Sequence, residues 1–272
     1  MNKEYTRYYP TFWAAVHLVV LYTFIQTLID FPLALYDYYH GTDWLYEPWV
    51  KVPVFFGSTV FILYWGYRRT GLSAGNVFPL GLYNIFVVPG LLLMLVALQL
   101  SLGKINVAFE KLLPPPGWFI EMFSRLFDSD LGVWGGILRV VIIAPVVEEL
   151  IFRGLIMRGF IRNYPKFLAI FYSALLFALF HLNPWQFPAT FLLGLILGWI
   201  RIRTGSVLAA ITGHAMHNGL VFLTVYYLTK LRRVGILPPD YKLNIPAVVL
   251  LFISGVIITF LATFTWKKKS AA

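Results

Sequence analysis

The sequence contains no cysteine among its 272 residues. Disulfide bonds, thiolate metal sites, a cysteine nucleophile and lipid attachment to cysteine are therefore excluded. Charged residues are also scarce, at 12% of the chain, and a soluble domain carries roughly twice that fraction. Hydrophobic residues make up 59% of the chain, and the mean hydropathy is +0.74. The composition therefore predicts an integral membrane protein with the lipid bilayer as a partner.

Basic residues exceed acidic ones, and the formal net charge is +10. They are distributed over short loops and the C-terminus, at Arg68, Arg69, Arg158, Arg162, Lys166, Arg201, Arg203, Lys267, Lys268 and Lys269. This distribution is typical of the positive-inside bias of membrane proteins. A nucleic-acid-binding surface needs a contiguous basic face, so we expect no nucleic-acid partner.

Apolar runs long enough to form membrane spans, which take about 20 residues each, recur along the chain. We expect them at residues 11–35, 52–67, 78–102, 134–160, 167–181, 189–202, 207–228 and 245–266. The predicted fold class is all-α, with about eight transmembrane helices in one bundle. Residues 1–272 would form a single integral membrane domain. Pro89-Gly90 predicts a kink in the third span, and residues 118–127 predict a helix that lies in the interface.

The predicted topology places both termini on the same side of the membrane. The three lysines at residues 267–269 assign that side to the cytoplasm. Loops after the second, fourth and sixth spans then face the cytoplasm, and each of them is basic. The loop after the first span is acidic and faces the other side. Lys230, Arg232 and Arg233 are the exception to this pattern. In a prokaryote the membrane would be the cell membrane.

Two glutamates and an arginine interrupt the fourth apolar run, at Glu148, Glu149 and Arg153. Three charges at bilayer depth would cost on the order of 7–10 kcal/mol, which is comparable to the stability of a whole domain. This cost favours a functional role over the alternative, a structural Glu–Arg clamp between helices. Residues four apart share one helix face, so Glu149 and Arg153 can pair. Glu148 points about 100° away and remains available as a general base.

Further polar side chains occur in two other predicted spans. His181 ends the fifth span, and His214, His217 and Asn218 lie inside the seventh. A lone histidine in a membrane helix more often forms an interhelical hydrogen bond than it catalyses a reaction. Three polar helices with complementary groups instead predict one polar chamber within the membrane. A carboxylate and a histidine can activate water there, and a second histidine with an amide can stabilise an oxyanion.

Other chemistries compete with this interpretation. Ser173 and Ser206 have no histidine at helix spacing, so a serine nucleophile is disfavoured. Glu148, His181 and His214 could instead bind Zn²⁺ and leave one position for water. The strong helical zinc signature, His-Glu-x-x-His, is not present in the sequence, so the sequence does not favour a metal.

Three motifs, taken together, resemble one known family. Glu148-Glu149-x-x-x-Arg153, Phe177-x-x-x-His181 and His214-x-x-x-Asn218 are similar in order and spacing to the motifs of the CAAX-protease and bacteriocin-processing family (CPBP, also called Abi). The resemblance covers about residues 145–218, within a family-like catalytic core at about residues 134–229. It implies an eight-helix intramembrane endopeptidase, whose relatives cut prenylated CAAX tails in eukaryotes. Prokaryotic relatives are associated with peptide maturation, bacteriocin immunity and processing of membrane proteins.

The resemblance also assigns roles to the residues of the motifs. Glu148 would be the water-activating base with His181 beside it, and His214 and Asn218 would form the oxyanion site. Glu149 and Arg153 would shape the chamber. His217 lies outside the family pattern and would support the site from behind. Members are described both as metalloproteases and as metal-free glutamate proteases, and we favour the metal-free mechanism, with Zn²⁺ as the alternative.

Two functions of other classes compete with a peptidase. Buried Glu, His and Arg side chains also form proton relays in transporters, although the chain shows no inverted repeat of the kind that transporters contain. A non-catalytic scaffold or immunity protein could use the chamber only to bind a peptide. The favoured prediction is an endopeptidase that acts on a membrane-anchored peptide or protein.

Overall fold

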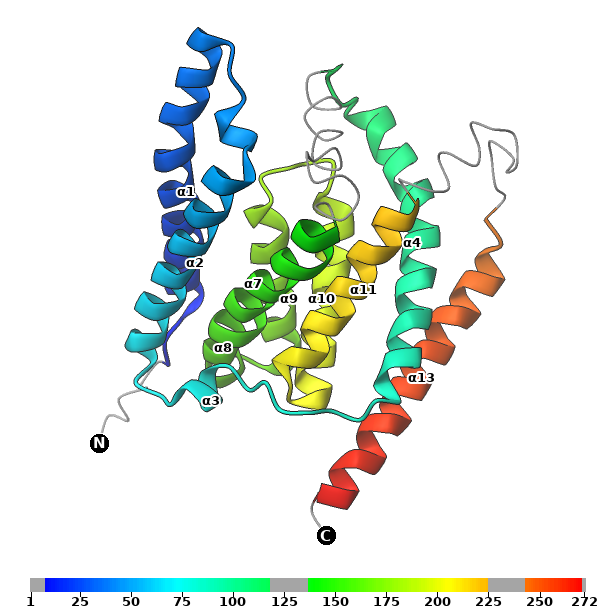
Figure 1. Cartoon of the computed structure of the whole chain (residues 1–272). Helices are drawn as coiled ribbons and strands as arrows, with labels where there is room; N and C mark the ends of the chain where they lie inside the picture. The colour runs from blue at the N-terminus through cyan, green and yellow to red at the C-terminus, as the bar shows by residue number, and fades with distance from the viewer. Residues whose placement is uncertain (1–7, 118–136, 225–242, 271–272) are drawn as a thin grey trace.

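The fold is a bundle of helices. The computed structural model describes residues 8–117, 137–224 and 243–270, and every regular element in these residues is an α-, 3-10 or π-helix. Figure 1 shows the long helices side by side, with the start of α1 and the end of α13 at the same end of the bundle. The all-α prediction is therefore confirmed for the described residues. The predicted interfacial helix at 118–127 and the basic residues from Lys230 to Arg233 lie outside them.

Four helices are long and apolar enough to cross a membrane. They are α1 (Phe12–His40), α4 (Val87–Leu112), α10 (Phe187–Thr204) and α13 (Ile245–Ser270, apolar over Ile245–Trp266). Two shorter apolar helices, α9 (Lys166–Phe180) and α11 (Val207–Leu223), pack between them in Figure 1. These helices support an integral membrane protein, and the total of eight spans stays a prediction.

The remaining predicted spans also coincide with helices. The second is α2 (Pro48–Thr70), and the short 3-10 helix η1 (Trp44–Tyr46) connects it to α1. The fourth is a continuous helical run made of η2 (Ile137–Ile143), α7 (Ala144–Glu149), η3 (Leu150–Ile156) and α8 (Met157–Asn163). The two η segments of this run are π-helical, and π-helical turns are frequent at functional sites.

The third predicted span begins later than residue 78. A short helix, α3 (Ala74–Val77), and a non-helical stretch precede α4, which starts at Val87. The Asn84 side chain accepts a hydrogen bond from the Phe86 N–H, and its carbonyl accepts one from the Val87 N–H. Pro89 therefore lies in the first turn of α4, where a missing N–H leaves no helical bond unmade. It belongs to the start of the helix and is not the mid-span kink that the sequence predicted.

Helices α9 and α10 approach each other closely at Gly194. A Cβ atom at this position would lie 2.9 Å from the Cα of Ala174 on α9, closer than real Cβ contacts. Gly194 and Gly198 are four residues apart, a spacing of small residues that allows two helices to pack closely. The close approach brings the backbone of α10 toward the helical run of the fourth span, where the charged residues lie.

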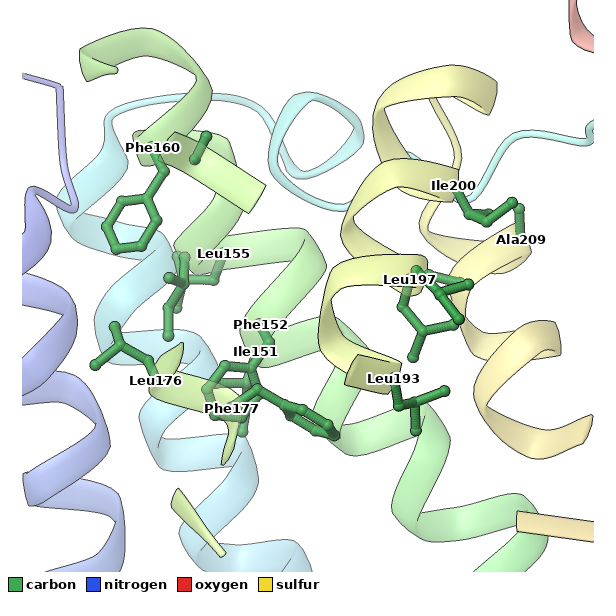
Figure 2. Packing of buried hydrophobic residues seen from close by; sticks show 14 of the residues in the cluster. Ile151, Phe152, Leu155, Phe160, Leu176, Phe177, Leu193, Leu197, Ile200 and Ala209 are labelled. Atoms are coloured by element: carbon green, nitrogen blue, oxygen red, sulfur yellow. The ribbon is translucent and has the colours of Figure 1, made fainter. Parts of the chain in front are cut away.

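The apolar core lies between η3, α8, α9, α10 and α11. Figure 2 shows Phe152, Leu155 and Phe160 of the fourth span, with Phe177 of α9 and Leu197 of α10. All five of these side chains are fully buried. This core holds the three motif-bearing helices in fixed positions relative to one another.

Candidate active site

The first motif begins in α7, which lies between two π-helical segments, and its Arg153 lies in the second of them, η3. Pro145 occupies the first turn of α7, directly after the π-helical η2. In the π register each carbonyl accepts from the N–H five residues later, and the partner of the Val140 carbonyl would be residue 145. Proline has no N–H. The carbonyl of Val140 therefore lacks its partner within the helix.

Asn218 of α11 supplies the missing donor. Its Nδ2 atom donates to the Val140 carbonyl at 2.8 Å, a contact between residues 78 positions apart in the sequence. The Asn218 amide nitrogen carries a second N–H in the same plane. The hydrogen bond of the first N–H to Val140 therefore fixes the direction of the second. Asn218 of the third motif thus binds the backbone of the helical run that carries the first motif, at the carbonyl that Pro145 leaves without a partner.

Glu149 and Arg153 form a buried ion pair, as their spacing predicted. The Arg153 Nη1 atom donates to Glu149 Oε1 at 2.9 Å, and both side chains are 0% exposed. Arg153 also donates from Nη2 to the Gly194 carbonyl at 3.1 Å. Its guanidinium lies 4.5 Å from the centroid of the Phe177 ring. A buried pair needs such additional contacts to offset its desolvation, and α9 and α10 supply them here.

His214 is oriented by Glu149. The His214 Nδ1 atom and Glu149 Oε1 are 3.0 Å apart, and the carboxylate can only accept, so Nδ1–H is the donor. The other ring nitrogen, Nε2, then faces Glu148, with 4.0 Å between Nε2 and Oε2. Glu149 therefore binds both Arg153 and His214 through one oxygen, and so it fixes the direction in which His214 presents Nε2.

His181 is oriented in the same way from α9. Its Nδ1 donates to the Phe177 carbonyl at 2.8 Å, and its Nε2 lies 3.9 Å from Glu148 Oε2. The Glu148 and His181 side chains are 16% and 21% exposed, whereas Glu149 is fully buried. Glu148 Oε2 makes no hydrogen bond with any residue that the structure describes. The two imidazoles thus face one carboxylate oxygen from opposite helices.

Phe177 is a site residue that the prediction did not assign. Its ring is fully buried and lies 4.9 Å from the His181 ring and 5.5 Å from the His214 ring, centroid to centroid. It also contacts Arg153. The spacing of Phe177 and His181, four residues on one helix, was the signal that could have identified it. Gly194, which allows α9 and α10 to pack closely, also accepts a hydrogen bond from Arg153 through its carbonyl.

Three other candidates do not join this group. His217 is buried, and its Nδ1 makes no hydrogen bond with any described residue. Ser173 donates to the Phe152 carbonyl at 3.4 Å, and Ser206 donates to the Gly81 carbonyl at 2.6 Å. Each serine is hydrogen-bonded to a backbone carbonyl, so the structure gives neither one a nucleophile's position beside a histidine.

A zinc ion does not fit this arrangement as it stands. Ligands of one tetrahedral zinc lie about 3.3 Å apart, given zinc–ligand distances of about 2.0–2.1 Å. Glu148 Oε2 is 3.9 and 4.0 Å from the two imidazole Nε2 atoms. Across residues 8–117, 137–224 and 243–270, no group of three or more His, Asp or Glu side chains is placed to hold a metal ion. We therefore derive no step through zinc.

Comparison with known proteins identifies a family model that matches part of the chain. Residues 130–220 match the family model described as "Type II CAAX prenyl endopeptidase Rce1-like". The matched segment contains all three motifs and every residue of the site described above. Searches of curated proteins and of solved structures give no significant match.

Proposed function

We propose that the chain, whose residues 130–220 match the model of the Rce1-like family of type II CAAX prenyl endopeptidases, hydrolyses peptide bonds within the membrane. Glu148 is the base that activates water. One observation carries the proposal. Glu148 Oε2 faces the Nε2 atoms of His181 and His214 at 3.9 and 4.0 Å and has no hydrogen bond to the described residues. Two groups that share one water lie roughly 4–5 Å apart, so these distances suit a bridging water.

The first step is attack by water on the scissile carbonyl carbon. Glu148 removes one proton from the water, and the His181 Nε2 atom accepts a hydrogen bond from the other proton. His181 can accept there because its Nδ1–H is bound to the Phe177 carbonyl. The new C–O bond forms as the carbonyl π electrons move to oxygen. No covalent bond forms between the enzyme and the substrate.

The second requirement is stabilisation of the resulting oxyanion. His214 must donate from Nε2 while Nδ1–H remains bound to Glu149, so it acts as an imidazolium. The Glu149 carboxylate stabilises that charge at 3.0 Å. The second N–H of Asn218 is the other donor. Such donors contribute about 10²–10³ in kcat each.

The final step breaks the C–N bond of the tetrahedral intermediate. Glu148 returns its proton to the leaving nitrogen, which departs as an amine. The other fragment keeps the oxygen atom that came from water in a new carboxylic acid. The proton of that acid then passes to the amine, so the products leave as a carboxylate and an ammonium ion. One water is consumed for each bond cut, and Glu148 ends the cycle deprotonated.

Cleavage of a quenched membrane-anchored peptide tests this proposal. The purified protein should yield two fragments, and in H₂¹⁸O the new carboxyl terminus should carry the heavy isotope. The Glu148→Ala variant should yield none. A parent protein that binds the peptide without cutting it would favour the scaffold alternative. Equal cleavage by parent and variant would contradict the assignment of Glu148.

A further inference from the structure

The two ends of the bundle carry different charges. One end, here called the arginine end, holds the basic residues of the last turns of α2, α8 and α10. It also holds the basic residues near the starts of α8 and α9. They are Arg68, Arg69, Arg158, Arg162, Lys166, Arg201 and Arg203. The lysines at residues 267–269 end α13 at the same end. Among the described residues this end contains no Asp or Glu.

The opposite end is mixed in charge. Asp37, Asp43 and Glu47 lie where α1 connects to α2, and Glu110 lies in the last turn of α4. Lys51, Lys104, Lys111 and Arg139 are also on this side. In the part of the chain that the structure describes, the arginine end therefore has ten Lys and Arg residues and the opposite end has four. Lys and Arg in short loops mark the cytoplasmic side of a membrane protein.

Aromatic contacts place the arginines of this end at the membrane interface. The guanidinium of Arg69 lies 3.7 Å from the Trp65 ring centroid, and that of Arg203 lies 4.2 Å from the Phe260 ring centroid. Arg162 lies 5.0 Å from the Tyr8 ring centroid. Arg and aromatic residues are enriched at headgroup level. The charge difference and these contacts both favour the arginine end as the cytoplasmic face of the bundle.

The catalytic groups lie away from this face. Helix α9 starts at Lys166 in the arginine end and ends at Phe180, directly before His181. The 15 residues of α9, at about 1.5 Å each, separate His181 from the arginine end by roughly 22 Å. The hydrocarbon core of a bilayer is about 30 Å thick, so His181 lies beyond its middle. The loop that follows His181 is tied to the far end of α4, because Trp185 Nε1 donates to the Leu113 carbonyl at 2.8 Å.

Buried side chains occupy the bundle between the site and the arginine end. The motif helix continues from Glu149 toward that end through Phe152, Leu155 and Phe160 (Figure 2). These three side chains and that of Ile156 are 0% exposed. Arg153 is also fully buried, and Arg201 donates to its carbonyl at 3.2 Å. Exposure of the site's own residues rises in the other direction, with 16% at Glu148 and 21% at His181.

We propose that the site opens on the face of the membrane opposite the cytoplasm. The inference rests on the proposed function, and it names the substrate class. The scissile bond would belong to a segment that has already crossed the membrane, such as the outer juxtamembrane part of an anchored protein or an exported peptide precursor. A cytoplasmic C-terminal tail, which is where prenyl groups are attached, would reach only the arginine end.

Thiol labelling of intact cells tests this orientation, because the chain has no cysteine of its own. Single cysteines would be placed at exposed positions as Asp43→Cys and Pro184→Cys on the opposite end, and as Ser73→Cys and Lys166→Cys at the arginine end. Spheroplasts expressing each variant would be treated with a membrane-impermeant maleimide before and after permeabilisation. Each variant would also be assayed for peptide cleavage in detergent, where orientation has no effect.

We expect the cysteines at residues 43 and 184 to be labelled fully in intact spheroplasts. Those at residues 73 and 166 should be labelled only after permeabilisation. The reverse pattern with normal cleavage in detergent would overturn this inference and leave the proposed function intact. The expected pattern without any cleavage by the parent protein would contradict the proposed function instead.

Discussion

Asn218 on α11 donates a hydrogen bond to the Val140 carbonyl, at 2.8 Å. In the π register the partner of this carbonyl would be the backbone N–H of residue 145. Residue 145 is a proline and has no N–H, so the carbonyl is available to Asn218. One amide therefore has two tasks. It completes the helix that carries the first motif with one N–H, and in the proposed mechanism it offers the second N–H to the reacting carbonyl.

The Pro145→Ala variant should separate these two tasks. Alanine restores a backbone N–H that competes with Asn218 for the carbonyl, and a released amide no longer aims at the oxyanion. We expect kcat to fall by up to about 100-fold, since misplacement by about 1 Å can cost that much. The melting temperature in detergent should not decrease. The matched control is Pro53→Ala in α2, an exposed proline within a helix, and an unchanged kcat in both variants would contradict the role of the missing N–H at residue 145.

The buried pair predicts a strong and non-additive effect on stability. Arg153→Met leaves the Glu149 carboxylate buried without its cation, which costs about 3–5 kcal/mol. The double variant Glu149→Gln with Arg153→Met removes both charges, so its loss should be smaller than the sum of the two single losses. Denaturant unfolding in detergent measures each value.

Arg69→Met serves as the control for this series. Arg69 is exposed and stacks on Trp65, so its loss should cost about 1 kcal/mol or less. Additive losses at residues 149 and 153 would show that the two side chains act independently, against the geometry described here.

Three glycines allow a graded test of helix packing. A Cβ at Gly194 would lie 2.9 Å from the Ala174 Cα, and one at Gly198 would lie 3.2 Å from the Ile170 Cγ2. Gly194→Ala should therefore destabilise by about 1–3 kcal/mol and should also lower activity, because the Gly194 carbonyl binds Arg153. Gly198→Ala should destabilise less, because the methyl group of Ile170 that the new Cβ would contact can move aside.

Gly57→Ala provides the opposite expectation. A Cβ added at Gly57 would have no atom within 4 Å, and Gly57 is inside α2. Alanine should stabilise that helix by about 0.5–1 kcal/mol. If Gly194→Ala were as well tolerated as Gly57→Ala, the close approach of α9 and α10 would be wrong.

Metal removal is expected to have no effect on cleavage. Glu148 Oε2 is too far from both imidazoles to share a tetrahedral zinc with them as they stand. Activity should survive prolonged treatment with a chelator, and elemental analysis should find less than one zinc per chain, as the metal-free mechanism requires. A stoichiometric metal that is lost together with activity, and restores it when added back, would favour the zinc alternative.

The sequence predicted features that depend on local spacing. The Glu149–Arg153 pair follows from a separation of four residues, and the helical spans follow from apolar runs. The start of α4 was predicted nine residues too early, at residue 78 instead of Val87. The residues before Val87 are apolar as well, and only the turn at Asn84 distinguishes them from the helix.

Features that depend on tertiary contacts could not be predicted in this way. The bond between Asn218 and Val140 requires a π-helical register, because in an α-helical register Pro145 would leave a different carbonyl free. Hydrophobic patterns do not reveal which of the two registers the helix adopts. The contact of the Gly194 carbonyl with Arg153 depends on how closely α9 and α10 pack. The polar side chains of three predicted spans indicated that Glu148, His181 and His214 share one chamber, and the family resemblance supplied their individual roles. Spacing within one helix cannot show how side chains of different helices face one another.

The turnover number of Glu148→Gln on a membrane-anchored peptide, compared with that of Glu110→Gln, tests the central claim most directly. Both variants remove one carboxylate without a change in size, and Glu110 is an exposed residue of α4. We predict a loss of about 10²–10⁴ in kcat for Glu148→Gln, with melting temperature and KM near those of the parent, and no change for Glu110→Gln. A Glu148→Gln variant that cleaves at the parental rate would contradict the role of Glu148 as the base.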